Sequence, residues 1–186
     1  MKSRLVNLFR SLRRIKYSFL STNINVEGRF IAHQPVLCNG LGKLKFGENV
    51  NFGVVNSPQF YNSYAYIEAR NKNATIIFGS NVHINNGFSI ISEKRISIGS
   101  NVLIGHNCQI TDSNFHDLDK NKRHETDPFP LDVIIGDKVF VGNNVIILKG
   151  VEIGENTVIA NGSLVTKSFP KNVIIGGVPA KTLKDL

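Results

Sequence analysis

Histidine is the side chain best suited to acid–base chemistry near neutral pH, because its ordinary pKa lies in that range. The sequence contains five: His33, His83, His106, His116 and His124. His116 stands out because carboxylates lie on both sides of it, in the stretch DSNFHDLD. An imidazole that a carboxylate orients can take the proton of a hydroxyl group while the oxygen attacks a carbonyl carbon. His116 is therefore a candidate general base. We expect Asp112 to orient it, since Asp117 reads more readily as a solvated loop acid.

The other histidines and the two cysteines are weaker candidates for catalysis or metal binding. His124 is a rival base, but it lies in a polar stretch, LDKNKRHETD, that is typical of an exposed tip. The histidines are dispersed without the spacing of metal ligands, so we expect no metal. Cys38 and Cys108 show neither metal-ligand spacing nor a disulfide framework, which indicates a reducing compartment.

A repeat of six residues determines which elements must position these groups. Aliphatic or aromatic residues recur at this spacing in four blocks: Phe46 and Phe52; Phe78, Ile84 and Ile90; Ile98, Ile104 and Ile110; and Ile135, Val141, Ile147, Ile153, Ile159 and Val165. A period of six is neither the 3.6 of a helix nor the 2 of an ordinary strand. It is typical of a short strand and a tight turn, three of which close one triangular coil. The pattern predicts an all-β fold, a left-handed parallel β-helix with aliphatic ladders inside.

Turn residues and breaks in the repeat complete this prediction. Glycine and asparagine adopt left-handed backbone angles at low cost, and we expect them at the corners, at Gly136, Asn143, Asn144, Gly154 and Asn156. The repeat is lost across residues 54–77 and 112–133. We expect three parts: an amphipathic segment over 1–29, a β-helix over 30–175 with an extruded loop over 112–133, and a C-terminal segment over 176–186. Long loops in a regular solenoid often carry function, and this loop carries His116.

Positive charge is concentrated at the N-terminus. The formal net charge is +8, but residues 1–20 hold six of the 22 basic residues and no acid, which leaves 16 basic against 14 acidic residues elsewhere. The body therefore gives no indication of nucleic-acid binding.

Residues 1–20 have helical apolar spacing, and we expect a helix that caps the open end of the coil. Contact with an anionic membrane surface is the alternative. No run is long enough for a transmembrane helix, so we expect a cytoplasmic protein, with peripheral contact at the inner face of the membrane left open.

The stretch from Ile98 to Lys184 resembles the hexapeptide-repeat acyltransferases, and most closely their galactoside, maltose and lipopolysaccharide O-acetyltransferase branch. It reads IGSNVLIGHNCQITDSNFHD, then IGDKVFVGNNVIILKGVEIGENTVIANGSLVTKSFPKNVIIGGVPAK. The resemblance implies transfer of an acetyl group from acetyl-CoA to a sugar hydroxyl, in polysaccharide or lipopolysaccharide synthesis. It also implies direct attack without an acyl-enzyme, with His116 as the base. The expected assembly is a homotrimer with active sites between subunits.

The resemblance also implies binding residues. For the saccharide acceptor they are Asn85, Glu93 and Asn114, where Glu93 replaces an aspartate of galactoside acetyltransferase; Asn85 has an equally good explanation as a corner residue. For acetyl-CoA they are Gly142, Asn143, Asn161, Thr166, Lys167 and Lys184. The lysines would suit the CoA phosphates, but they could equally be solvated surface residues.

Other functions remain possible on this fold. One is an N-acyltransferase for an amino-sugar nucleotide, although the short N-terminal part leaves little room for a nucleotide-binding domain. Another is a non-enzymatic scaffold or a metal-dependent carbonic anhydrase. A covalent role for Cys108 is disfavoured, because it occupies a small-residue position of the repeat and we expect it to pack inward.

Overall fold

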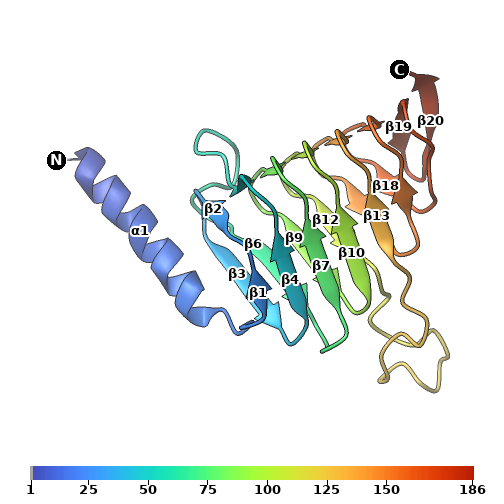
Figure 1. The fold of residues 1–186 in the computed structure, drawn as a ribbon, viewed down its shortest axis with the longest axis horizontal. Helices are drawn as coiled ribbons and strands as arrows, with labels where there is room; N and C mark the ends of the chain where they lie inside the picture. Colours follow the sequence, from blue (N-terminus) through green and yellow to red (C-terminus); the bar gives the residue numbers. More distant parts are fainter. Residues whose placement is uncertain (1) are drawn as a thin grey trace.

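The computed structural model describes residues 2–186, which form a left-handed parallel β-helix preceded by one α-helix, α1 (Lys2–Leu20) (Figure 1). Three sheets form the sides of the prism. Sheet A contains β1 (Val26–Glu27), β4 (Lys43–Phe46), β7 (Thr75–Phe78), β10 (Arg95–Ile98), β13 (Val133–Ile135) and β16 (Glu152–Ile153). Sheet B contains β2 (Phe30–Ala32), β5 (Val50–Phe52), β8 (His83–Ile84), β11 (Leu103–Ile104), β14 (Phe140–Val141), β17 (Val158–Ile159), β19 (Val173–Gly177) and β20 (Ala180–Asp185). Sheet C contains β3 (Val36–Gly40), β6 (Ala65–Ala69), β9 (Ser89–Ser92), β12 (Gln109–Thr111), β15 (Ile146–Ile147) and β18 (Leu164–Val165).

The chain visits the sheets in the order A, B, C, so each set of three strands is one coil. Neighbouring coils pair in parallel, and the residues of the six-residue repeat lie directly above one another. Ile98 pairs with Ile135, Ile104 with Val141, and Ile110 with Ile147. All the repeat residues after Phe52 are at most 3% exposed. The predicted fold class and its interior ladders are confirmed.

The corners use asparagine and glycine for two different purposes. Asn144 and Asn156 have φ near +57°, as expected, and the same left-handed angle occurs at Asn81 and Asn101 of earlier coils. Gly136, Asn143 and Gly154, where we also expected this angle, do not have positive φ. A Cβ on Gly154 would lie 2.3 Å from the amide nitrogen of Lys171 in the next coil. These glycines are therefore required for close stacking of the coils, which corrects the expectation that they supply turn angles.

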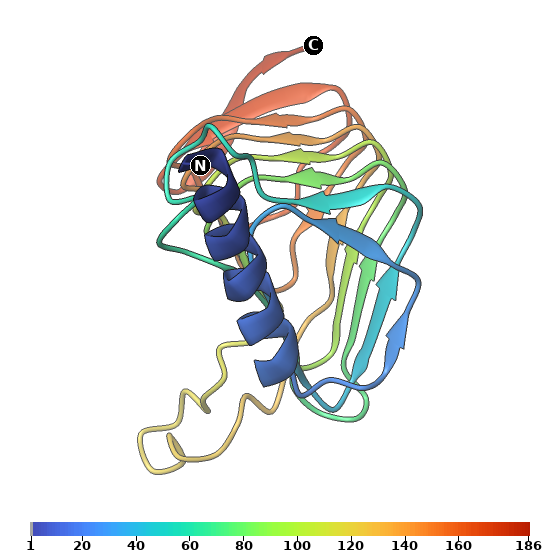
Figure 2. The same cartoon turned by 90° about the vertical axis from the view of Figure 1, so that its left-hand side faces the viewer.

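Two segments leave the regular coil, at different corners. Residues 53–64 protrude between sheets B and C, whereas residues 112–132 protrude between sheets C and A (Figures 1 and 2). A parallel strand that is paired on both sides has no room for an insertion, so both insertions occur at corners. At the C-terminal end, β20 folds back antiparallel on β19.

Helix α1 lies at the N-terminal end of the β-helix (Figure 2). It does not pack as we expected of a cap. Its side-chain contacts with the body come from Arg10, Arg13, Arg14 and Tyr17, whereas its leucines and phenylalanines remain exposed. Within residues 2–186, no helix combines the length and the hydropathy needed to cross a membrane.

The interior ladders predict a sharp contrast between two adjacent isoleucines of β15. Ile147 is fully buried, whereas Ile146 is 38% exposed on the outer face. We expect Ile147→Ala to destabilise the protein by about 2–5 kcal/mol, because it leaves a cavity between stacked coils. Ile146→Ala, the matched control, should cost about 1 kcal/mol or less. Urea unfolding of both variants would check this, and equal losses would contradict the assignment of inner and outer faces.

Candidate active site

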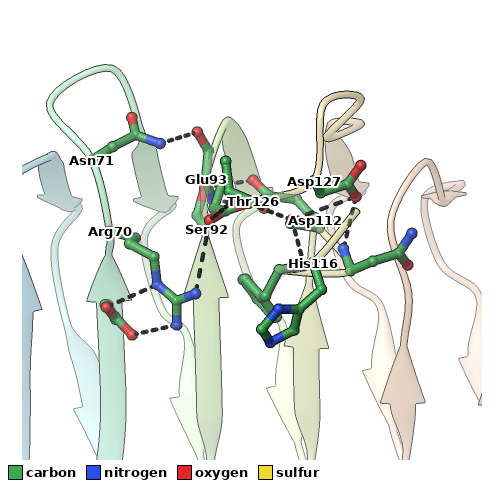
Figure 3. Close-up of polar contacts among 12 residues, drawn as sticks. Arg70, Asn71, Ser92, Glu93, Asp112, His116, Thr126 and Asp127 are labelled. Atoms are coloured by element: carbon green, nitrogen blue, oxygen red, sulfur yellow. Dashed lines mark hydrogen bonds and ion pairs between the residues drawn. The ribbon is translucent and has the colours of Figure 1, made fainter. Parts of the chain in front are cut away.

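His116 lies exposed in the loop of residues 112–132 (Figure 3). Its Nδ1 is 2.8 Å from the carbonyl oxygen of Arg123, across the same loop. A carbonyl oxygen can only accept a hydrogen bond, so Nδ1 carries the proton in the neutral ring. The Nε2 atom then has a free lone pair and can act as a base.

Asp112 does not have the role that we expected. Its carboxylate is fully buried and accepts hydrogen bonds from the Ser92 hydroxyl (2.5 Å) and from the amides of Glu93 (2.8 Å) and Lys94 (3.0 Å). It therefore ties the base of the loop to the turn of the preceding coil. The orientation of His116 comes from a backbone carbonyl, because both oxygens of Asp112 are already engaged with that turn.

Glu93 is also placed differently from the expectation that it binds the acceptor. Its side chain is only 6% exposed. One carboxylate oxygen accepts from the Ser113 hydroxyl (2.5 Å), and the other accepts from the Thr126 hydroxyl (2.6 Å). Ser113 and Thr126 lie near the two ends of the loop, so this one carboxylate holds both ends against the coil (Figure 3).

Asp127 provides a second anchor for the same loop. Its carboxylate accepts from the Lys149 ammonium (2.5 Å) and from the backbone amide of Asn114 (2.8 Å). Burial acts to raise the pKa of Asp127, but the Asn114 amide and the Lys149 ammonium outweigh it, and the pKa is lowered. Asn114, a predicted acceptor-binding residue, has an exposed side chain two positions before His116.

The residue before His116 is held in an unusual conformation. Phe115 has φ of +61°, which is rare for a bulky side chain. Its ring lies 4.4 Å from the guanidinium carbon of Arg70, which is itself bound to Glu68 at 3.1 Å. This contact with the segment that follows β6, two coils before the loop, stabilises the backbone from which His116 projects. Sequence reasoning missed Arg70, Phe115 and Asp127, because nothing local marks a side chain whose partner lies 20–45 residues away.

A second group of predicted residues lies at the corner between sheets B and C. Asn85 and Asn143 line a shallow hollow of about 240 Å³, which Leu103 and Phe140 of sheet B also border. The amide oxygen of Asn143 accepts from the backbone of His106 (3.0 Å). The amide oxygen of Asn161 accepts from the backbone of Asn143 (2.6 Å). Both asparagines therefore support coil stacking through their amide oxygens.

Gly142 explains the close fit at this corner, because a Cβ there would lie 2.5 Å from the Asn161 amide oxygen. The remaining candidates lie elsewhere. Thr166 and Lys167 are exposed just after β18, at the corner between sheets C and A, and Lys184 is exposed on β20. One chain therefore brings Asn85, Gly142, Asn143 and Asn161 to one corner and the His116 loop to another.

Cys108 is buried and its Sγ lies 3.0 Å from the carbonyl oxygen of Gly142. Burial raises the pKa of its thiol to about 11, so it remains a protonated packing group near neutral pH. Within the part of the chain that the structure describes, no group of three His, Cys, Asp or Glu side chains could hold a metal ion.

Comparison with known proteins assigns the family. The description "Bacterial transferase hexapeptide (six repeats)" matches residues 132–167, and "Hexapeptide repeat of succinyl-transferase" matches residues 95–111. The chain is 30% identical over 179 residues to the Escherichia coli protein named "Putative lipopolysaccharide biosynthesis O-acetyl transferase WbbJ", with 92% of this chain and 86% of that protein covered. This chain belongs to the hexapeptide-repeat acyltransferase family.

A second relative and a solved structure are consistent with this family and fold. The galactoside O-acetyltransferase of Escherichia coli is 35% identical over 115 residues, which cover 59% of this chain. The chain spans only 56% of the length of that relative. A crystal structure of a hexapeptide transferase family protein from Anaplasma phagocytophilum has a TM-score of 0.61 at 18% identity, covering 89% of this chain and 80% of that one. It supports the fold.

The anchors of the loop predict how it opens. Asp127→Asn removes the charge that pairs with Lys149, so the loop should open more often. We expect trypsin to cleave about tenfold faster after Lys120, Lys122 and Arg123, in proportion to the open population. Asp117→Asn is the matched control, since the one side-chain bond found for Asp117 is to the nearby Asp119 amide.

The contact of Asp127 with Lys149 and the Asn114 amide should weaken at low pH. The pKa of Asp127 is lowered from its ordinary 3.8, so the stabilisation is present above that pH and is lost as the pH falls below it. Equal cleavage rates in Asp127→Asn and wild type at neutral pH would show that Asp127 does not hold the loop.

Proposed function

We propose that this protein is an acetyl-CoA-dependent O-acetyltransferase that acts on a sugar hydroxyl in cell-surface polysaccharide or lipopolysaccharide synthesis. The observation that carries the proposal is His116, whose Nδ1 donates to the Arg123 carbonyl and whose Nε2 is left as a base in an exposed loop. The names of the relatives support the acetyl donor and the saccharide acceptor. One is named a galactoside O-acetyltransferase and the other a "Putative lipopolysaccharide biosynthesis O-acetyl transferase".

The reaction needs no covalent enzyme intermediate. The Nε2 atom of His116 takes the proton of the acceptor hydroxyl while the oxygen attacks the thioester carbonyl carbon of acetyl-CoA. The tetrahedral intermediate then collapses, the C–S bond breaks, and the imidazolium returns the proton to the departing thiolate. The Arg123 carbonyl holds the ring in one tautomer through both proton transfers, and it interacts more strongly with the imidazolium than with the neutral ring.

The acceptor site in this proposal includes Asn85 and Asn114, whose side chains are accessible. Glu93 contributes through the loop, because both of its oxygens are used by Ser113 and Thr126. For CoA we propose the NH2 groups of Asn143 and Asn161 and the backbone at Gly142, with Thr166, Lys167 and Lys184 toward the phosphates. Lysine ammonium groups suit phosphates as point charges.

The division of these residues over two corners supports a homotrimer. In a ring of three prisms, the His116 loop of one subunit can lie beside the corner between sheets B and C of its neighbour. The exposed Leu103 and Phe140 on sheet B supply apolar surface beside that corner. Each proposed active site then needs two chains.

The base is tested by replacing His116. We expect His116→Ala to lower acetyl-CoA turnover with a saccharide acceptor by about 10²–10⁴-fold, measured as thiol release, while CoA binding stays unchanged. His124→Ala, in the same loop, is the matched control and should keep wild-type turnover. Retained turnover in His116→Ala would remove this residue as the base. An amino-sugar acceptor that outpaces every hydroxyl acceptor would favour N-acyl transfer.

The shared site is tested by mixing two inactive variants. His116→Ala lacks the base, and Lys184→Glu, on β20 of sheet B, should lose affinity for CoA. Co-expressed, they should regain about a quarter of wild-type activity, since that fraction of interfaces pairs an intact loop with intact CoA-binding coils. Sedimentation of the wild type should give a trimer. A trimer without recovered activity would place both groups on one chain.

A further inference from the structure

We propose that α1 lies on an anionic lipid surface, through a stripe of exposed apolar side chains. The apolar stripe consists of Leu5, Leu8, Phe9, Leu12, Ile15, Phe19 and Leu20. These side chains are between 48% and 87% exposed. At 100° per residue they fall on one side of the helix, with Lys16 among them, as in helices that lie in a membrane interface. The inference does not depend on the proposed catalytic function.

The way in which α1 is attached makes the stripe available. The guanidinium of Arg13 donates to the carbonyl oxygens of Phe60 (2.9 Å) and Ser63 (2.7 Å), and the ring of Tyr17 packs on Tyr64 at 4.6 Å. An amphipathic helix on a water-soluble body normally buries its apolar side. Here the side with Arg10, Arg13 and Tyr17 faces the body, so the apolar stripe faces away from those contacts.

Charge identifies the occupant as anionic. Residues 2–20 contain six basic residues and no acid: Lys2, Arg4, Arg10, Arg13, Arg14 and Lys16. The arginines that contact the body use neutral acceptors, namely the Tyr61 hydroxyl and backbone carbonyls. Among the described side chains, no ion pair neutralises the positive charge of Arg4, Arg10, Arg13, Arg14 and Lys16. Each basic residue near an anionic lipid surface strengthens binding about fivefold.

The same charge disfavours a second copy of the chain as the occupant. Two apolar stripes packed together would bring two helices without acidic residues face to face, with like charges along both edges.

The apolar surface also extends beyond the helix. A cavity of about 460 Å³ opens between α1 and the first coil, and Ile15 of the stripe lines it together with Phe30 and Val36. A lipid surface can cover both, because acyl chains adapt to an uneven apolar surface.

Flotation of the full chain with lipid vesicles tests the proposal. We expect binding to vesicles of phosphatidylcholine mixed with phosphatidylglycerol, weak binding to phosphatidylcholine alone, and loss of binding in high salt. Leu12→Glu should lower the bound fraction about tenfold or more, because a charge replaces a leucine that would be inserted into the lipid. Leu183→Glu is the matched control, since Leu183 is 60% exposed against 56% for Leu12 but lies at the opposite end of the molecule (Figure 1).

Three outcomes would overturn the proposal. The first is equal binding of wild type and Leu12→Glu. The second is equal binding to neutral and anionic vesicles. The third is absence of vesicle binding together with a smaller oligomer for Leu12→Glu in light scattering, which would make the stripe a contact between copies. The assay contains neither CoA nor acceptor, so its result is independent of the transferase test.

Discussion

Close stacking of the coils is the constraint on which the rest of this structure depends. Each coil contributes short strands that pair in parallel above and below, and each repeat position buries one aliphatic or aromatic side chain. The backbones approach so closely that a Cβ on Gly154 would lie 2.3 Å from the amide of Lys171. A strand held in this way cannot accept an insertion. Variation is therefore confined to the corners and the ends, and those are the places where the candidate functional residues and α1 are found.

Buried carboxylates fix the position of the long loop of residues 112–132 at its corner. Apolar side chains of the loop of residues 112–132, such as Leu118 and Phe129, remain exposed, so the loop is held mainly by polar contacts with the coils. Asp112, Glu93 and Asp127 accept hydrogen bonds from the turn of the preceding coil, from both ends of the loop and from Lys149. A buried carboxylate without partners would be strongly unfavourable, so these contacts specify one position of the loop. The position of His116 follows from them.

These carboxylates also show why residues carried over from a family need a structure. Glu93, which the resemblance suggested as an acceptor-binding residue, here reaches Ser113 and Thr126 of the loop. Asp112 is close to His116 in sequence, yet it faces the coil, and the Arg123 carbonyl takes over the orientation of the ring. Helix α1 is also attached by polar contacts. Arg13 docks the helix on the body, and the leucines of the helix stay exposed.

The sequence by itself determined the fold, because a period of six allows one buried side chain per strand and this regularity has a single simple solution. It also determined that His116 lies in a protruding loop, since the repeat stops at Ile110 and resumes at Ile135. Only the tertiary structure decided what the glycines, the carboxylates and the helix faces do. Glu93 contacts Ser113, Asp127 contacts Lys149 and Arg70 contacts Phe115, at separations of 20, 22 and 45 residues. Such contacts leave no periodic trace in the sequence. The face of α1 that docks depends on the segment 53–64, whose side chains had no recognisable pattern until the coil placed them beside the helix.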